Sequence, residues 1–346
     1  MIRSRKRRLW LCAWLLPLAA QAQTYTKTET IEYHDNLSLW VLGQPSKLTV
    51  NGIVASETLY DGRAQPTTVR EFGRTAQTLS YHPDGTVATV ADGRGNVTTL
   101  SGWKRGVPQT VRHPATPEAP NGATRSAVVN DAGWITRVTD ENGYATNYQH
   151  DAMGRITRIV HPTGDSVAWH DSTFSFVRAT APAYGIPAGH WQHTEVTGHR
   201  AKIVFLDALW RPILVHEYDG TNLAGTQRFT RQTFDHEGRV TFAAYPSTSH
   251  ASNTGTWTEY DALGRATSVS QDSESGLLTT LTEYLPGFRT RVTDPKGHQT
   301  VTEYQAFDQP TYDFPVVIDA PAGRYTEIRR DVFGKPLSIT RSGPED

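Results

Sequence analysis

The chain has 346 residues, of which 37% are hydrophobic, 10% aromatic and 20% charged. These proportions are typical of a folded globular protein and exclude an intrinsically disordered one. With 34 Lys and Arg against 35 Asp and Glu, the formal net charge is −1. The chain therefore has no basic excess of the kind that nucleic-acid binding requires.

The first 22 residues are predicted to form a secretory signal peptide. Basic residues from Arg3 to Arg8 precede the apolar run 9–18, and Ala20-Gln21-Ala22 supplies a small-residue cleavage site. The run is shorter than the roughly 20 residues of a membrane-spanning helix, so a membrane anchor is the disfavoured alternative. This segment contains five basic and no acidic residues. Without it, residues 23–346 carry a formal net charge of −6. The sequence thus predicts a protein exported to the periplasm, the cell surface or the medium.

A short unit that begins with aspartate and usually contains glycine three positions later recurs along residues 23–346. The residues at these two positions are Asp61, Asp151, Gly154, Asp207, Asp235, Gly238, Asp261, Gly264, Asp331 and Gly334. Degenerate copies occupy 102–108 and 304–310, and a second motif repeats at Val138–Gly143 and Val292–Gly297. Self-similarity of this kind predicts a repeat architecture.

The unit has the chemistry of a tight turn between strands. Aspartate accepts a hydrogen bond from the backbone two residues on, and glycine takes the left-handed conformation that closes a hairpin with a bulge. Flanking segments such as Arg155–Ile159 alternate in polarity like half-buried strands. Trp210 stands where other copies have glycine, so we expect a different turn type there.

Because isolated hairpins are marginally stable, the units are expected to stack on one another. The sequence predicts an all-β fold in which tandem hairpins lie side by side in a curved, partly closed sheet. The aromatic residues before the aspartates, Tyr60, Phe234, Tyr260 and Tyr304, are expected to pack between neighbouring units. Residues 165–200 interrupt the rhythm and are expected to form an irregular loop between two repeat blocks, the best candidate for a binding feature.

Catalytic and metal-binding patterns are weak. His190, His193 and His199 cluster without a spaced acidic or cysteine partner, and the only cysteine, Cys12, lies in the predicted signal peptide. The sequence has no nucleophile-elbow, zinc-protease or phosphate-loop motif, so we expect neither an enzyme nor a cofactor. Glycan binding is the serious alternative, because exposed rings can stack on sugars. The candidates for glycan or partner contact are Trp103, Trp134, Trp169, Trp191 and Trp257.

The recurrent Tyr-Asp-Ala-Leu-Gly-Arg units, seen intact at 260–265, resemble the YD repeats of bacterial rearrangement-hotspot (Rhs) proteins and their teneurin-like relatives. The resemblance covers most of residues 30–340. It implies a shell-like wall of β-strands that encloses or presents a partner polypeptide, such as a toxin or the remainder of an Rhs shell. The leading hypothesis is therefore a structural wall or scaffold, and a cell-surface adhesin or carbohydrate-binding repeat module is the alternative.

Overall fold

The computed structural model describes residues 25–164, 166–307 and 311–344. The predicted signal peptide lies outside these residues. Strands dominate the described chain, and its single α-helix, α1, spans only Leu223–Thr226. The predicted all-β class is confirmed. In the described residues no helix is long and apolar enough to cross a membrane.

Twenty-six strands follow one another along the described chain. Strands β1 to β9 are Glu29–Asn36, Val41–Val50, Ile53–Tyr60, Pro66–Glu71, Arg74–Tyr81, Val87–Asp92, Val97–Ser101, Thr110–Arg112 and Thr124–Val129. Strands β10 to β18 are Ile135–Thr139, Ala145–His150, Ile156–Val160, Ser172–Arg178, Trp191–Thr197, Arg200–Leu206, Pro212–Asp219, Arg228–Phe234 and Val240–Ala244. Strands β19 to β26 are Gly255–Tyr260, Ala266–Ser273, Gly276–Leu285, Arg289–Thr293, Gln299–Tyr304, Pro315–Ala320, Arg324–Arg330 and Pro336–Ser342.

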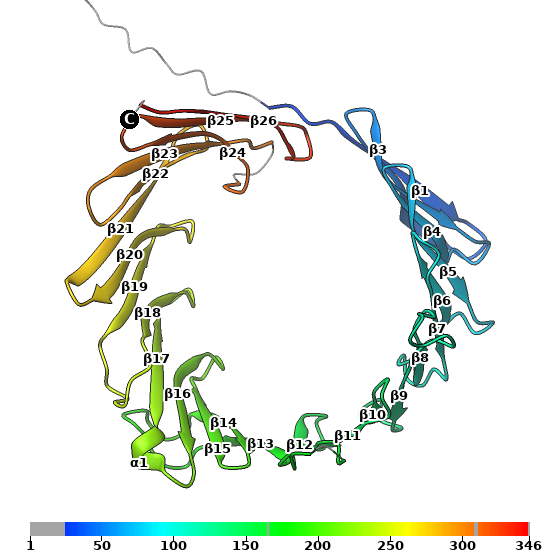
Figure 1. The fold of residues 1–346 in the computed structure, drawn as a ribbon, viewed down its shortest axis with the longest axis horizontal. Helices are drawn as coiled ribbons and strands as arrows, with labels where there is room; N and C mark the ends of the chain where they lie inside the picture. The colour runs from blue at the N-terminus through cyan, green and yellow to red at the C-terminus, as the bar shows by residue number, and fades with distance from the viewer. Residues whose placement is uncertain (1–24, 165, 308–310, 345–346) are drawn as a thin grey trace, which may run out of the picture. The chain divides into compact units, whose positions relative to one another are not determined.

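The chain divides into two compact units. The larger comprises Lys27–Glu283 and Arg291–Thr300, and the smaller comprises the segment that ends at Thr26, Tyr284–Thr290 and the chain from Val301 onward. In the larger unit each strand from β1 to β20 pairs antiparallel with its successor, in chain order (Figure 1). Strands β23 to β26 pair in the same way. The hairpins therefore lie side by side, as the repeat predicts.

One turn geometry recurs in eleven connections of the described chain. The backbone N–H of residue i donates to the carbonyl of i+4, and the N–H of i+3 donates to the carbonyl of i. The first residues of these turns are Asp61, His82, Asp92, Asn130, Asp140, Asp151, Asp207, Asp235, Asp261, Asp294 and Asp331. Strand register shifts by one residue beside these turns, for example between Glu259 and Tyr260, as in a hairpin with a bulge.

The expectation of a different turn type at Trp210 is wrong. Trp210 adopts φ +62°, and its backbone N–H donates to the carbonyl of Asp207, the same hydrogen bond that glycine makes in other copies. Ala64 does the same at φ +60° in the copy that begins with Asp61. The side-chain and backbone bonds of the turn, together with ring contacts of Trp210 to Phe176 and Trp191, hold a conformation that these residues rarely adopt alone.

The alternation of strand direction separates two rims of the larger unit. Turns that follow odd-numbered strands lie at one rim, and connections that follow even-numbered strands lie at the other. The first, here called the turn rim, carries the copies that begin with Asp61, His82, Asn130, Asp151, Asp207, Asp235 and Asp261. The second, here called the loop rim, carries Asp92 and Asp140 together with longer loops such as 245–254.

The expected irregular loop over residues 165–200 is also wrong in its extent. This stretch contains β13 and β14, which pair over their full lengths from Ser172↔Thr197 to Arg178↔Trp191. Alternating Phe174 and Phe176 supply the period-two pattern of β13, which the nearby Pro and Gly residues obscure in the sequence. The long irregular part is residues 179–190, tipped by a tight turn at Tyr184-Gly185 with positive φ at both positions.

Replacing Gly154 tests the turn geometry. Its φ is +84°, and an added Cβ would lie 2.8 Å from Nε1 of Trp134. Gly143 has φ +89° but open space around an added Cβ. We expect Gly143→Ala to destabilise by about 1 kcal/mol through backbone strain alone, and Gly154→Ala to destabilise more in urea unfolding. Equal effects of the two substitutions would show that the Trp134 contact is unimportant, and no effect of either would contradict the turn geometry.

Candidate functional site

Where an aspartate begins the turn, its carboxylate accepts hydrogen bonds from backbone N–H groups of the same turn. One oxygen, Oδ1, accepts the N–H groups of residues i+2 and i+4 at 2.8 to 3.0 Å. The aspartates that do so are Asp61, Asp92, Asp140, Asp151, Asp207, Asp235, Asp261, Asp294 and Asp331. These carboxylates thus satisfy donors that a turn would otherwise leave exposed.

Four copies add an ion pair inside the turn. Nε of Arg155, Arg211, Arg239 and Arg265 donates to Oδ2 of the aspartate four residues earlier, at 2.6 to 2.8 Å. The Arg265 guanidinium and the backbone N–H of Arg265 hold the pKa of Asp261 below its usual range. The carboxylate therefore stays ionised and acts as a hydrogen-bond acceptor.

The same arginines connect neighbouring copies of the turn. Nη1 of Arg239 donates to the carbonyl oxygen of Asp261 at 3.2 Å, and its guanidinium lies 4.9 Å from the centroid of the Tyr260 ring. The hydroxyl of Tyr260 donates back to the carbonyl of Val240 at 2.9 Å. Arg211 repeats the stacking on Phe234 at 4.7 Å. Tyr260 and Phe234, the aromatic residues before Asp261 and Asp235, are thus packed between hairpins.

Other side chains perform this bridging in turns that have no arginine four residues after the first residue. Gln44 and Gln65 donate to the carbonyl oxygens of Ala64 and Gly85, at 3.0 and 3.1 Å. Further donors to the backbone of an adjacent turn or strand are Tyr60, Tyr81, Trp103 and Arg105. In the smaller unit Gln305 donates to the carbonyl of Asp331 at 3.3 Å. We propose that the turn residues singled out in the sequence are architectural.

Removing the Arg239 side chain should weaken the contact between two hairpins. We expect Arg239→Met to lower the thermal unfolding midpoint by a few degrees, because a turn ion pair, a backbone hydrogen bond and a ring contact disappear together. Arg291→Met is the control, since Arg291 makes a single ion pair with Glu283 at 3.2 Å. A larger decrease for the control would contradict the bridging role.

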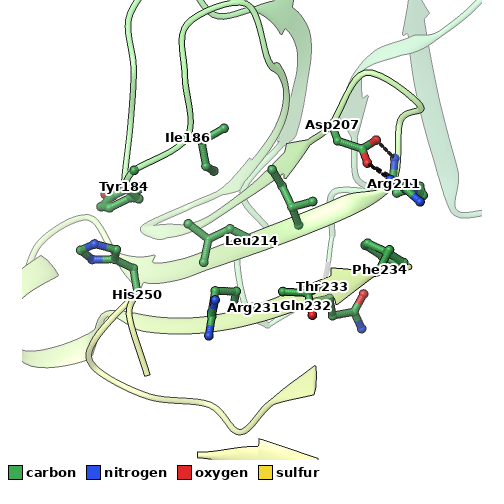
Figure 2. Close-up of a pocket in the computed structure, with 12 residues that line it drawn as sticks. Tyr184, Ile186, Asp207, Arg211, Leu214, Arg231, Gln232, Thr233, Phe234 and His250 are labelled. Carbon is green, nitrogen blue, oxygen red and sulfur yellow. Dashed lines mark hydrogen bonds and ion pairs between the residues drawn. The ribbon is translucent and has the colours of Figure 1, made fainter. Parts of the chain in front are cut away.

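A pocket of about 390 Å³ lies beside the turn rim, between β16, β17 and two loops. Figure 2 shows Tyr184 and Ile186 above it, Leu214 and Arg231 on the strands, His250 at one end and the Asp207–Arg211 pair at the other. The tip of the 179–190 connection reaches this face, where the Tyr184 ring contacts Phe205, His216, Phe229 and His250 at centroid distances of 5.1 to 5.5 Å. Phe205, Leu214 and Phe229 form the buried core beneath.

His216 is the most deeply enclosed polar side chain of this cluster. It is 2% exposed, stacks on Phe229 at 4.2 Å, and its Nδ1 lies 3.2 Å from the hydroxyl oxygen of Tyr184. Burial lowers the pKa of His216, because the charged imidazolium loses its hydration among these rings. The sequence gives no direct signal for this cluster, since Tyr184 and His250 lie on loops at opposite rims.

Acidification should therefore destabilise the larger unit through His216. A histidine with a lowered pKa binds fewer protons in the folded state, so stability is full above its unfolded pKa of about 6.5 and decreases as pH falls below it. We expect His216→Phe to flatten the decrease of the urea midpoint between about pH 6.5 and 5. His236→Asn is the control, since the His236 side chain is 85% exposed. An unchanged pH slope in His216→Phe would contradict the assignment.

The tryptophans proposed for glycan or partner contact fall into two groups. Trp103 donates to the carbonyl of Val87 at 2.9 Å, Trp134 covers Gly154, Trp191 stacks on Phe176 at 5.0 Å, and Trp257 packs on Phe242 at 4.9 Å. These four are half-buried between strands, whereas Trp169 is 62% exposed. Among the described residues, no three His, Cys, Asp or Glu side chains are grouped to hold a metal ion.

Comparison with known proteins finds similarity in part of the repeat region. Residues 129–166 match the family model described as RHS Repeat. Teneurin-4 of Mus musculus is 25% identical over 115 residues, which cover 29% of this chain and 4% of teneurin-4. The chain thus spans a small fraction of this curated relative.

The solved structures that match are also far longer than this chain. The match to the crystal structure of TcdB2-TccC3-Cdc42 covers 93% of this chain and 19% of the chain in that structure, with 10% sequence identity and a TM-score of 0.35. The match to the structure of the Photorhabdus luminescens Tc holotoxin pore covers 92% of this chain and 18% of the chain in that structure, with 9% sequence identity and a TM-score of 0.33.

The fold and the row of identical turns define a class, the all-β repeat proteins built from tandem hairpins. Within this class, residues 129–166 match the RHS Repeat family model. The resemblance predicted from the Tyr-Asp-Ala-Leu-Gly-Arg units is confirmed.

Proposed function

We propose that this Rhs-repeat chain is a non-enzymatic structural wall of an exported protein, and that the wall encloses or presents a partner polypeptide. The observation that carries the proposal is that the recurring residues are engaged in contacts within and between the hairpins. The same aspartates, arginines and aromatic rings close turns and bridge hairpins in successive copies. A role repeated in so many copies is better explained by architecture than by a single chemical site.

The extent of the sheet also supports a scaffold. Most side chains along the strands are only partly buried, and the one cluster of buried hydrophobic side chains in the described residues consists of Phe205, Leu214 and Phe229. Half-buried side chains along many strands give a wide surface that can contact an extended partner through numerous small contacts. A protein that binds a small substrate would instead need one deep, convergent pocket.

Affinity purification of the tagged full-length chain from its native host tests the proposal. We expect export with cleavage after residue 22, shown by N-terminal sequencing, and one polypeptide bound in a fixed ratio. The bound polypeptide should become sensitive to protease when the wall is destabilised by Gly154→Val and Gly264→Val together. The same chain purified from a heterologous host controls for contaminants. Retention on a glycan array by a chain that carries no polypeptide would contradict the proposal and favour the adhesin alternative.

A further inference from the structure

A second pocket, here called the loop-rim pocket, lies between the turn that begins at Asp140 and the residues His161, Pro162 and Trp169, which follow β12. It has a volume of about 390 Å³ and is lined by Asp140, Tyr144, His161, Pro162 and Trp169. Both large rings are accessible, since Tyr144 is 46% and Trp169 62% exposed. Among the described residues, the lining thus combines two aromatic rings, a histidine and a proline with one carboxylate, and it includes no lysine or arginine.

Asp140 differs from six of the eight other turn aspartates in the state of its second oxygen. Its Oδ1 accepts the N–H groups of Asn142 and Tyr144 at 3.0 and 2.8 Å, as in the other copies. In six other copies Oδ2 accepts a side chain from position i+4, namely Asn96, Arg155, Arg211, Arg239, Arg265 and His298.

Position i+4 of this copy is Tyr144, and within residues 25–164, 166–307 and 311–344 no side chain hydrogen-bonds to Asp140. A carboxylate that lines a pocket with one oxygen unused offers a negative charge to whatever enters.

His161 and Trp169 form the opposite side of the pocket, and contacts with β13 and β14 hold His161 in position. Nε2 of His161 lies 3.2 Å from Oγ of Ser172, and that oxygen lies 2.7 Å from Oγ1 of Thr197. The His161 ring lies 6.0 Å from the Trp169 ring, centroid to centroid. The imidazole thus connects the loop to β13 and β14, and it supports the indole that forms one wall.

We propose that the loop-rim pocket binds a substituted ammonium group, between the Tyr144 and Trp169 rings and against the Asp140 carboxylate. Aromatic faces attract organic cations, and the carboxylate supplies the opposite charge. A neutral sugar would need several convergent donors and acceptors, of which the pocket offers few, and an anion would be repelled. The ammonium group can come from a lysine side chain of a polypeptide or from a free amine. The site goes beyond the proposed wall function and does not depend on it.

Calorimetric titration of the full chain at pH 8 with tetramethylammonium and with n-butylammonium tests the site. We expect saturable binding that weakens with added salt, because opposite charges attract. Asp140→Asn and Trp169→Ala should each weaken binding by about tenfold. Asparagine can keep the turn, since Asn130 caps an equivalent turn by accepting the Trp134 N–H at 2.9 Å. Unfolding midpoints of both variants verify that the fold is retained.

The matched control is Asp92→Asn, a change in the same turn at the same rim, where Oδ2 already accepts Asn96. It should leave ammonium binding unchanged. A lysine-containing peptide that binds more tightly than n-butylammonium would identify a polypeptide as the source, and equal affinities would identify a free amine. The proposal is overturned by no saturable binding of either probe, by full binding in Asp140→Asn, or by binding of methyl glucoside in place of the ammonium probes.

Discussion

The carboxylate that folds back onto its own turn is the interaction on which the sheet depends. A hairpin that reverses in so few residues exposes backbone N–H groups and forces one residue to positive φ. In the copy at Asp261 the carboxylate accepts two of these donors, Gly264 takes φ +78°, and Arg265 neutralises the remaining oxygen. Because the arginine also reaches the next turn in two copies, closure of one hairpin and its attachment to its neighbour are physically coupled.

The repeat could be found in the sequence because its turn chemistry is local. Asp151 and Gly154, or Asp235 and Gly238, need only each other to define a turn, so their spacing reveals it. The copies at His82, Asp92 and Asn130 were missed as members of the same series, although each has glycine three residues later. A search for any turn-capping residue followed at that spacing by glycine would have found them. The aspartate is thus one of several side chains that can begin the turn.

The failures of sequence reasoning have physical causes that are not local. Trp210 adopts φ +62° because contacts with Phe176 and Trp191, from strands earlier in the chain, add to the bonds of the turn. The core at His216 depends on loops from opposite rims that meet over one face, where Tyr184 contacts His250. Neither arrangement follows from residue type and spacing along one strand. The pocket beside Asp140 likewise depends on the placement of Trp169 by a separate loop.

The separation of the two rims constrains how such a chain can lengthen or shorten. Loss of a single strand would reverse the direction of every later strand and move the following bends, with their aromatic and arginine partners, to the opposite side. Loss or gain of two strands, which the 26-residue interval from Asp235 to Asp261 contains, leaves all later bends where they were. Duplication of strands in pairs is therefore the change in length that keeps each turn next to turns on its own rim.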